Sequence, residues 1–221
     1  MARPTRIIAV RHGETEWNVE GRLQGSRDSA LTERGRKQSE RLGCALTKVK
    51  LTAAYSSDLG RARETAQIAL ARASKASVRL ELDPRLREIS YGRIEGLTWR
   101  EVEALHPDIH RSMEERRQDF APPGGESRTE LVERITETFK ELGRRHRSET
   151  IFVVTHGGAL SAFLRHILGI PAAERRFVRA ENCALNRFDF RGDHFRLVTW
   201  GERTHLDLDV DVEVGVGVGV E

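Results

Sequence analysis

Two histidines stand at matching places in the sequence. His12 follows the apolar run 7–10 and Arg11, His156 follows the apolar run 151–155, and a glycine comes directly after each histidine. Continuous apolar runs rich in β-branched residues are typical of parallel strands that are covered on both faces. Ligands bind at the carboxyl ends of such strands, so the two imidazoles are expected to converge if the two strands are neighbours.

Two arginines indicate that this site binds an anion. Arg11 precedes the first histidine, and Arg61 falls in the first turn of the helical pattern 59–72, which Ser57 or Asp58 would cap. Planar guanidinium groups and the amides of a helix N-terminus suit the oxygens of a phosphoryl group. The combination therefore predicts a phosphate site.

A histidine among such cations is suited to attack phosphorus. A nucleophilic imidazole must be neutral, its unperturbed pKa is about 6.5, and neighbouring positive charge lowers that value. We expect His12 to attack in line and form a phosphohistidine, with no need of a metal or another cofactor. Three side chains would hold the equatorial oxygens: Arg11, Arg61 and His156. Zinc held by the two histidines is the alternative, but arginines stand where carboxylate or thiolate ligands would be needed.

The leaving alkoxide needs a proton donor, and Glu88 is the candidate. The side chains around it in the sequence are apolar: Leu86, Ile89 and Tyr91. Partial burial would favour the protonated carboxyl group. Glu14 competes for this role. Surface alternatives also stay open, with Glu88 as an exposed glutamate and Arg61 as the partner of Glu64 in an ion pair.

Strand-like and helical patterns alternate along the chain, which predicts an α/β fold. The strand-like segments are 5–10, 53–57, 78–82 and 150–155, and the helical segments are 31–49, 59–72 and 159–169. Residues 184–200 alternate with period two around a turn at 191–193, which predicts a hairpin that closes the sheet.

Two capping boxes predict further helix starts: Thr98 with Glu101, and Ser127 with Glu130. The second opens a helix in which four apolar residues fall on one face: Leu131, Ile135, Phe139 and Leu142. The stretch 93–125 is expected to be a mainly helical insertion.

Composition limits the class of protein. One domain is expected over residues 1–205, because 221 residues with 38% hydrophobic side chains can bury a core. The 37 basic and 34 acidic residues are interleaved, so neither nucleic acid nor a membrane surface is indicated as a partner. Cys44 and Cys183 lack the spacing of a disulfide framework or a zinc site. Without a signal segment or membrane span, a cytoplasmic location is expected.

The tail 206–221 is a low-complexity stretch of Asp, Val and Gly. Its glycines offer no side chains to pack and its first half is acidic, so we predict disorder. The alternative is an edge strand that self-associates.

From about residue 6 to 205 the sequence resembles the histidine phosphatase superfamily, in its phosphoglycerate-mutase-like branch 1. The motifs that carry the resemblance occur in order: RHGETEWN (11–18), RLQGSRDSALTERGRKQ (22–38), YSSDLGRARETA (55–66), LREISYGRIEGLT (86–98), PPGGES (122–127), VVTHGG (153–158) and ENCALNRF (181–188). The resemblance implies a three-layer αβα sandwich with a mostly parallel sheet, one antiparallel edge strand and a small, mainly helical insertion at about 93–125 that roofs the site. Two departures concern packing: Ala9 stands where a larger aliphatic residue is usual, and Ser29-Ala30-Leu31 lacks the customary proline.

The resemblance also implies roles for individual residues. His12 is similar to the phosphorylated nucleophile of the family, and Glu88 is similar to its acid–base group. The phosphate pocket would comprise Arg11, Arg61 and His156, supported by Asn18 and by the amide of Gly157. The substrate entrance would be lined by Gln24 and Gly25.

The resemblance favours a metal-independent phosphatase that hydrolyses small phosphomonoesters. The stretch between Glu88 and His156 is shorter than the insertion of the mutases that it resembles, and PPGGES is similar to the phosphatase members. Phosphoglycerate mutase-type transfer stays open, because Arg116 and Arg117 offer contacts for an acidic substrate. A non-catalytic phosphate-binding module is a third alternative. The expected partner is a small phosphorylated metabolite of unidentified structure, and a homodimer stays open.

Overall fold

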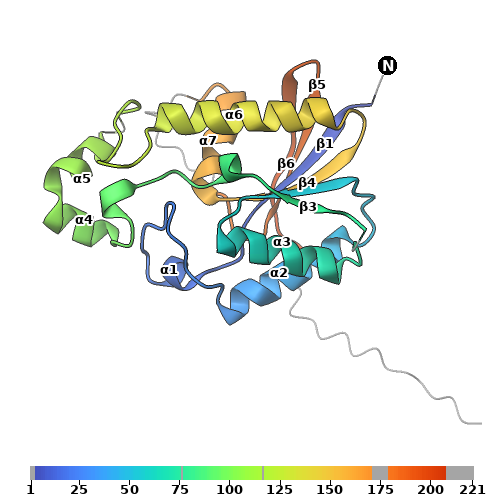
Figure 1. Cartoon of the computed structure of the whole chain (residues 1–221), viewed down its shortest axis with the longest axis horizontal. Coiled ribbons are helices and arrows are strands. Elements are labelled where there is room, and N and C mark those ends of the chain that lie inside the picture. Colours follow the sequence, from blue (N-terminus) through green and yellow to red (C-terminus); the bar gives the residue numbers. More distant parts are fainter. Residues whose placement is uncertain (1–2, 76, 116, 171–178, 208–221) are drawn as a thin grey trace, which may run out of the picture.

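The computed structural model describes residues 3–75, 77–115, 117–170 and 179–207, and within these ranges the chain forms a six-stranded sheet (Figure 1). The strands are β1 (Thr5–Arg11), β2 (Ala53–Ser56), β3 (Leu80–Leu82), β4 (Thr150–Thr155), β5 (Leu185–Arg191) and β6 (His194–Glu202). Their order is β3-β2-β4-β1-β5-β6. Strands β3, β2, β4 and β1 pair with their neighbours in parallel, whereas β5 pairs antiparallel with both β1 and β6. The predicted mostly parallel sheet is confirmed, and the predicted hairpin closes it: the antiparallel strand β5 lies beside the edge strand β6.

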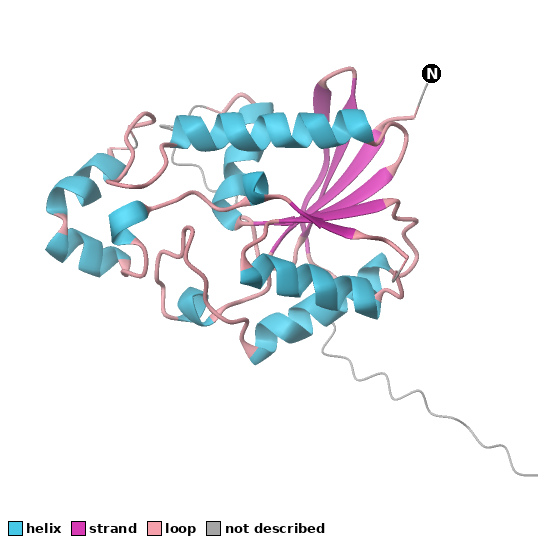
Figure 2. Cartoon of the chain, viewed as in Figure 1, coloured by secondary structure: helices cyan, strands magenta, loops and turns pink. Residues whose placement is uncertain are grey.

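Helices cover both faces of the sheet (Figures 1 and 2). They are α1 (Glu16–Val19), α2 (Glu33–Leu46), α3 (Gly60–Arg72), α4 (Trp99–Leu105), α5 (Pro107–Glu114), α6 (Arg128–Arg145) and α7 (Gly157–Ile167), with 3-10 turns η1 (Pro84–Leu86) and η2 (Gly92–Ile94). The pair α2 and α3 lies on one face, and the pair α6 and α7 lies on the other (Figure 2). The expected three-layer αβα sandwich follows from this arrangement.

Alternation along β1 explains why both faces need helices. Ile7 and Ala9 belong to the hydrophobic cluster beneath α6 and α7, whereas Ile8 and Val10 belong to the cluster beneath α2 and α3. Successive side chains of a strand point to opposite faces, so an unbroken apolar run must be covered twice. Burial on both faces fixes the strand and thereby the positions of the residues that follow it.

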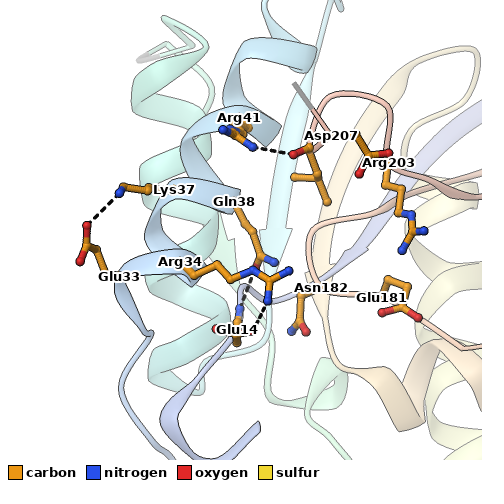
Figure 3. A pocket seen from close by; sticks show the side chains of 11 residues that line it. Glu14, Glu33, Arg34, Lys37, Gln38, Arg41, Glu181, Asn182, Arg203 and Asp207 are labelled. Atoms are coloured by element: carbon orange, nitrogen blue, oxygen red, sulfur yellow. Dashed lines mark hydrogen bonds and ion pairs between the residues drawn. The ribbon is translucent and has the colours of Figure 1, made fainter. Parts of the chain in front are cut away.

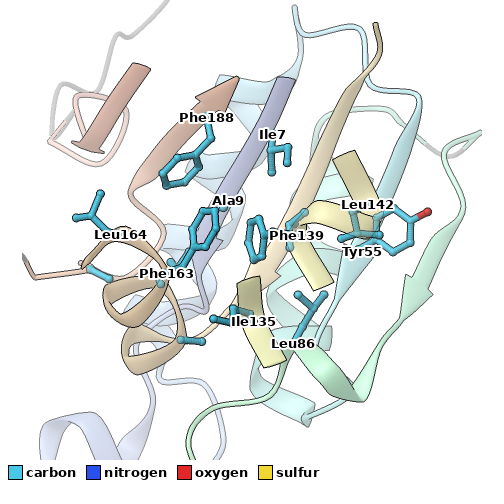
Figure 4. Close-up of a cluster of buried hydrophobic side chains, with 14 of the residues drawn as sticks. Ile7, Ala9, Tyr55, Leu86, Ile135, Phe139, Leu142, Phe163, Leu164 and Phe188 are labelled. Atoms are coloured by element: carbon cyan, nitrogen blue, oxygen red, sulfur yellow. The ribbon is translucent and has the colours of Figure 1, made fainter. Parts of the chain in front are cut away.

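Ala9 lies among aromatic rings (Figure 4). Its side chain is fully buried in the cluster where Phe139 of α6 stacks on Phe163 of α7 with ring centroids 4.4 Å apart. Phe163 in turn meets Phe188 of β5 edge to face at 5.1 Å. The small side chain of Ala9 leaves room for these rings, so the departure from a larger aliphatic residue is accommodated by packing.

The expected helical insertion is present as η2, α4 and α5. Both capping boxes form, at Thr98 with Glu101 and at Ser127 with Glu130. The insertion has its own small apolar cluster around Ile94, Val102 and Ile109. Backbone hydrogen bonds join it to the loop before α2: the Leu23 amide donates to the Leu97 carbonyl, and the Gly96 amide donates to the Leu23 carbonyl. The insertion therefore fixes the loop on which Gln24 and Gly25 lie.

The described chain continues slightly past the domain boundary expected at residue 205. Leu206 packs against the cluster beneath α2 and α3. Residues 208–221, most of the tail for which disorder is predicted, lie outside the described ranges. Within those ranges, none of the helices has the length and apolar character needed to cross a membrane.

Candidate phosphoryl-transfer site

The two predicted histidines meet at the carboxyl ends of neighbouring strands. Arg11 is paired with Thr155 in the parallel register of β1 and β4, and the His12 amide donates to the Thr155 carbonyl at 3.0 Å. The imidazole rings of His12 and His156 are 5.2 Å apart between centroids. Both side chains are buried, at 3% and 0% exposure. The predicted convergence of the two histidines is confirmed.

Hydrogen bonds select one tautomer of His12. Nδ1 lies 2.7 Å from the Gly13 carbonyl oxygen, which can only accept, so Nδ1 carries the proton. Nε2 then holds the lone pair, and it accepts a hydrogen bond from Nε of Arg61 at 3.2 Å. Burial, followed by the charges of Arg11 and Arg61, lowers the pKa of His12 well below 6.5. The expected effect of the arginines is confirmed, although burial is the larger cause.

Arg61 is a buried guanidinium with a nearly complete set of acceptors. Besides its bond to His12, Nη1 donates to the Arg27 carbonyl at 2.6 Å and to Oδ1 of Asp28 at 3.1 Å. Nη2 donates to the Gly25 carbonyl at 2.8 Å. An arginine has five N–H groups, so about one remains for a ligand. Arg61 therefore positions the groups around it and has too few unused N–H groups to bind an anion in a bidentate manner.

The predicted cap of α3 is wrong. Leu59 is the N-cap residue of α3, and it makes no side-chain capping hydrogen bond. The first amides of the helix donate instead to the carboxylate of Asp28. Asp58 forms an ion pair with Arg87, outside the helix. Asp28 is brought to α3 from a distant loop, so a local sequence pattern does not reveal it.

Arg36 resolves the surface alternative for Arg61. Its guanidinium binds Glu64 at 2.9 Å, whereas the Arg61 side chain is only 1% exposed and binds Asp28. The surface pair of Arg61 with Glu64 is therefore not formed.

His156 and Arg11 carry the unsatisfied polar atoms of the site. Both ring nitrogens of His156 and Nε of Arg11 are buried without a hydrogen-bond partner among the described residues. Arg11 has one such bond, from Nη1 to the Ala180 carbonyl at 3.1 Å. Buried polar atoms without partners are costly, so they indicate a place for a ligand. Donors that converge beside a helix N-terminus suit an anion.

His156 is neutral in this environment. Burial is the largest cause that lowers its pKa well below 6.5, followed by the charge of Arg61, and Arg11 adds a smaller effect. A neutral imidazole offers one N–H donor, so His156 is suited to donate a hydrogen bond rather than to carry a charge. The next residue, Gly157, begins α7, and a Cβ there would stand 3.3 Å from Nε of Arg11. Glycine keeps the helix N-terminus close to that guanidinium.

Glu88 sits at the N-terminus of α7, half-buried. Its Oε2 accepts from the Gly158 amide at 2.8 Å, and its Oε1 accepts from the amides of Ala159 at 3.0 Å and Ile89 at 2.9 Å. These three amides make the surroundings of the carboxylate more polar than the neighbouring sequence predicts, and their bonds fix its position at the start of α7.

Helix α1 and the loop between α1 and α2 bring three further predicted residues to the site. Gly25 adopts φ +55°, and a Cβ on it would overlap Oε1 of Glu95 at 2.2 Å. Gln24 is 7% exposed, donates from Nε2 to the Thr15 hydroxyl at 2.7 Å, and leaves its buried Oε1 without a partner. Asn18 accepts the Thr15 amide through Oδ1 in the capping box of α1.

Sequence reasoning missed two residues that hold this loop and the strand end. Asn182 donates from Nδ2 to the His12 carbonyl at 2.7 Å and to Oδ1 of Asn18 at 3.4 Å. Oε1 of Glu95 accepts from the amides of Ser26 and Tyr91 at 2.8 and 3.0 Å. Both residues occur within motifs already noted, ENCALNRF and LREISYGRIEGLT, but the partners of Asn182 and the Ser26 partner of Glu95 are distant in sequence.

A cavity of about 700 Å³ lies beside α2 and is lined mostly by charged side chains (Figure 3). Two of its cations form ion pairs within the protein: Lys37 with Glu33 at 2.8 Å and Arg34 with Glu14 at 3.3 Å. The carboxylate of Glu14 also accepts the Thr32 hydroxyl at 2.9 Å. The competing acid candidate Glu14 is therefore already bound by Arg34 and Thr32.

The zinc alternative meets an electrostatic obstacle. Nε2 of His12 faces the guanidinium of Arg61 at 3.2 Å, where a metal cation would be repelled. In the described part of the chain, no group of three or more His, Cys, Asp or Glu side chains is placed to hold a metal ion.

Comparisons with known proteins place this geometry in a family. Residues 7–203 match the model of the histidine phosphatase superfamily, branch 1. Phosphoglycerate mutase-like protein 4 of Arabidopsis thaliana is 38% identical over 204 residues, which cover 91% of this chain and 86% of that protein. The structure of Bacillus stearothermophilus YhfR is similar with a TM-score of 0.85 and 33% identity, over 92% of this chain and all of that one. A mycobacterial glucosyl-3-phosphoglycerate phosphatase in complex with VO3 has a TM-score of 0.78 and 29% identity, over 90% of this chain and 100% of that one.

The two buried histidines predict a loss of stability in acid. In the unfolded chain their pKa is about 6.5, and in the folded chain it is lower, so below pH 6.5 the unfolded state binds more protons. The free energy of unfolding should therefore be constant above about pH 7.5 and fall as the pH drops below about 6.5. Urea unfolding at a series of pH values measures this.

Variants separate the buried histidines from the rest of the protein. His156→Gln should reduce the slope of stability against pH below 6.5, whereas His194→Gln, which removes an exposed histidine, should leave it unchanged. Identical slopes in His156→Gln and the parent protein would contradict the assignment.

Asp28 is predicted to support anion binding through Arg61. Asp28→Asn removes the ion pair and weakens the cap of α3, so orthovanadate should bind about tenfold more weakly, equivalent to ~1.4 kcal/mol. Calorimetric titration measures the affinity. Asp58→Asn is the matched control, because it breaks only the ion pair with Arg87 and should leave the affinity unchanged. A larger loss in the control than in Asp28→Asn would exclude this role.

Proposed function

The chain belongs to the histidine phosphatase superfamily, branch 1, and from that premise we propose that it is a metal-independent phosphatase that hydrolyses small phosphomonoesters through a phosphohistidine. The observation that carries the proposal is the state of His12. Its Nδ1 is committed to the Gly13 carbonyl, and its Nε2 lone pair lies beside the unsatisfied donors of Arg11 and His156. A neutral nucleophile thus stands at the edge of an anion pocket.

In the first step, Nε2 of His12 attacks phosphorus. A P–N bond forms, the P–O bond to the alcohol breaks, and Glu88 gives a proton to the departing oxygen. The hydrogen bond from Nδ1 to the Gly13 carbonyl stabilises the positive charge that develops on the ring.

In the second step, water attacks the phosphohistidine. The Glu88 carboxylate takes a proton from the water, an O–P bond forms, and the P–N bond to His12 breaks. Inorganic phosphate leaves, and the imidazole returns to its neutral form with the proton on Nδ1. The amides that hold Glu88 at the start of α7 keep the carboxylate in reach during both steps.

The remaining site residues bind the phosphoryl group and position the reacting atoms. Arg11 supplies the guanidinium with unused donors, and the last free N–H of Arg61 adds to it. Single donors complete the pocket: the ring of His156, the amide of Gly157, and the side-chain amides of Asn18 and Gln24. Gly25 orients Arg61 through its carbonyl.

Mutase-type phosphoryl transfer is the second candidate, and the Arabidopsis relative's name favours it. A mutase returns the phosphoryl group from the histidine to a second hydroxyl group, whereas a phosphatase gives it to water. Of the arginines that would serve an acidic substrate, Arg117 is exposed, and Arg116 lies outside the described residues. A binding module without catalysis would form no phosphohistidine, so it is the easiest alternative to test.

The covalent intermediate is the first prediction of this proposal. Incubation with ³²P-labelled esters in the presence of a chelator should give an acid-labile, base-stable phosphoenzyme and release phosphate. His12→Ala should abolish both, with a fall in kcat of about 10³-fold or more. His194→Ala, at an exposed histidine, is the control and should retain the activity of the parent protein. Undiminished turnover in His12→Ala would refute the proposal.

The second prediction concerns the proton given by Glu88. Glu88→Gln should slow the hydrolysis of alkyl phosphates far more than that of p-nitrophenyl phosphate, because the nitrophenolate needs little protonation. We expect a difference of about 10²-fold between the two losses in kcat. Equal losses on both esters would remove the acid role and leave Glu88 as a positioning group. Glu130→Gln, at the exposed capping box of α6, is the matched control.

A further inference from the structure

The four backbone carbonyls of residues 85–88 all accept hydrogen bonds from side chains of other elements. The guanidinium of Arg134, on α6, donates to three of them at 2.7, 3.0 and 3.4 Å: Arg85, Arg87 and Glu88. The carbonyl of Leu86 accepts from the Thr155 hydroxyl at 2.6 Å. Residues 87–91 belong to no helix or strand, so these side chains supply the hydrogen bonds that regular structure would otherwise provide.

Arg134 uses its whole guanidinium group in this arrangement. Besides its bonds to the three carbonyls, Nε donates to Oε1 of Glu126 at 2.8 Å and Nη2 donates to Oε2 of Glu126 at 2.6 Å. These bonds account for the five N–H groups of an arginine. The two side chains are mostly buried, with 24% of Arg134 and 16% of Glu126 exposed. The bidentate pair therefore fixes the plane of the guanidinium toward the chain that carries Glu88.

Glu88 is thereby fixed at both ends. Two amides at the start of α7 bind its carboxylate, whereas Arg134 on α6 binds its main-chain carbonyl and two of the three carbonyls before it. The remaining carbonyl is bound by Thr155, the residue directly before His156. A misplacement of about 1 Å in a reacting group can reduce a rate by about 10²-fold. The position of this carboxyl group therefore depends on a side chain that lies outside the phosphate pocket.

The charge of Arg134 has a separate, weaker effect. Burial is the largest cause that lowers the pKa of His156, the charge of Arg61 comes next, and the charge of Arg134 adds a smaller effect. A lysine would keep a positive charge at this place but would lack the planar fork of five donors. The conservative substitution therefore separates the effect of charge from the effect of the carbonyl contacts.

We propose that Arg134 is a positioning residue for proton transfer: through the carbonyls that it binds, it keeps Glu88 within reach of the departing oxygen, and Glu126 orients Arg134. The proposal rests on the proposed phosphatase function, since it concerns the acid of that reaction. Arg134 does not bind the phosphoryl group in this scheme, because its N–H groups are all bonded within the protein.

Substitutions of Arg134 should show the ester dependence expected of a fault in Glu88. Arg134→Met removes all the donors, and Arg134→Lys keeps only the charge. We expect each to lower kcat/KM for benzyl phosphate by about tenfold or more, and kcat/KM for p-nitrophenyl phosphate by less than about threefold, because nitrophenolate needs little protonation. Arg144→Met is the matched control, since it removes an exposed arginine of the same helix that pairs with Asp193, and it should change neither value.

A double-variant cycle assigns the loss to Glu88. In a Glu88→Gln protein no carboxyl proton is left to position, so adding Arg134→Met should lower kcat/KM for benzyl phosphate by less than about twofold. A full additional loss in that background would overturn the proposal, as would equal losses on both esters in Arg134→Met. Activity restored to that of the parent in Arg134→Lys would also overturn it, because the effect would then be one of charge.

A second variant and a count of active sites complete the test. Glu126→Gln weakens the bidentate pair without removing Arg134, so it should cause a smaller loss with the same preference for benzyl phosphate, and it decides the question where Arg134→Met does not fold. Labelling from a ³²P ester counts the sites that form phosphohistidine. Absence of label in the parent would overturn the phosphatase function itself, whereas normal labelling with equal losses on both esters would overturn only the role of Arg134.

Discussion

The burial of one charged side chain, Arg61, is the constraint on which the rest of the site depends. A guanidinium removed from water must find acceptors for its N–H groups, because a buried charge without partners is strongly destabilising. Arg61 finds them in the loop before α2, at Gly25, Arg27 and Asp28, and on the ring of His12. One side chain of α3 thus ties a loop and the end of β1 into a single arrangement.

The same burial sets the chemistry of the histidines. Removal from water and the two nearby guanidinium groups both disfavour an imidazolium, so His12 and His156 are neutral. Positive charge and buried donors without a protein partner gather at the same place, where the proposed phosphoryl group would accept from the donors and compensate the charge. The hydrogen bond from Nε of Arg61 occupies the Nε2 lone pair of His12, so this bond must break before the proposed attack on phosphorus.

Strand patterns predicted that His12 and His156 lie together, because the register of two parallel strands places residues that are distant in sequence side by side. Apolar runs identified β1 and β4, and their pairing brings His12 and His156 together across most of the chain. Capping boxes, which span four residues, were equally readable. The cap of α3 was not, since Asp28 reaches the helix through a loop whose course depends on Gly25 at φ +55° and on Glu95. The role of Asn182 was not predicted for the same reason, because its partners His12 and Asn18 lie near the other end of the sequence.

The proposed reacting groups and the walls of a neighbouring cavity are held in place in different ways. The proposed reacting groups lie where β1, β4 and the N-termini of α3 and α7 meet, and each is held by backbone register or by a buried charge. The cavity, between α5, α6 and α7, is lined by side chains that none of these interactions requires, among them Val132 and Arg128. A change at Val132 or Arg128 therefore leaves the position of His12 unaltered. A change at Arg61 releases His12 and the loop together, so the fold constrains the two histidines and the loop before α2 far more than the walls of that cavity.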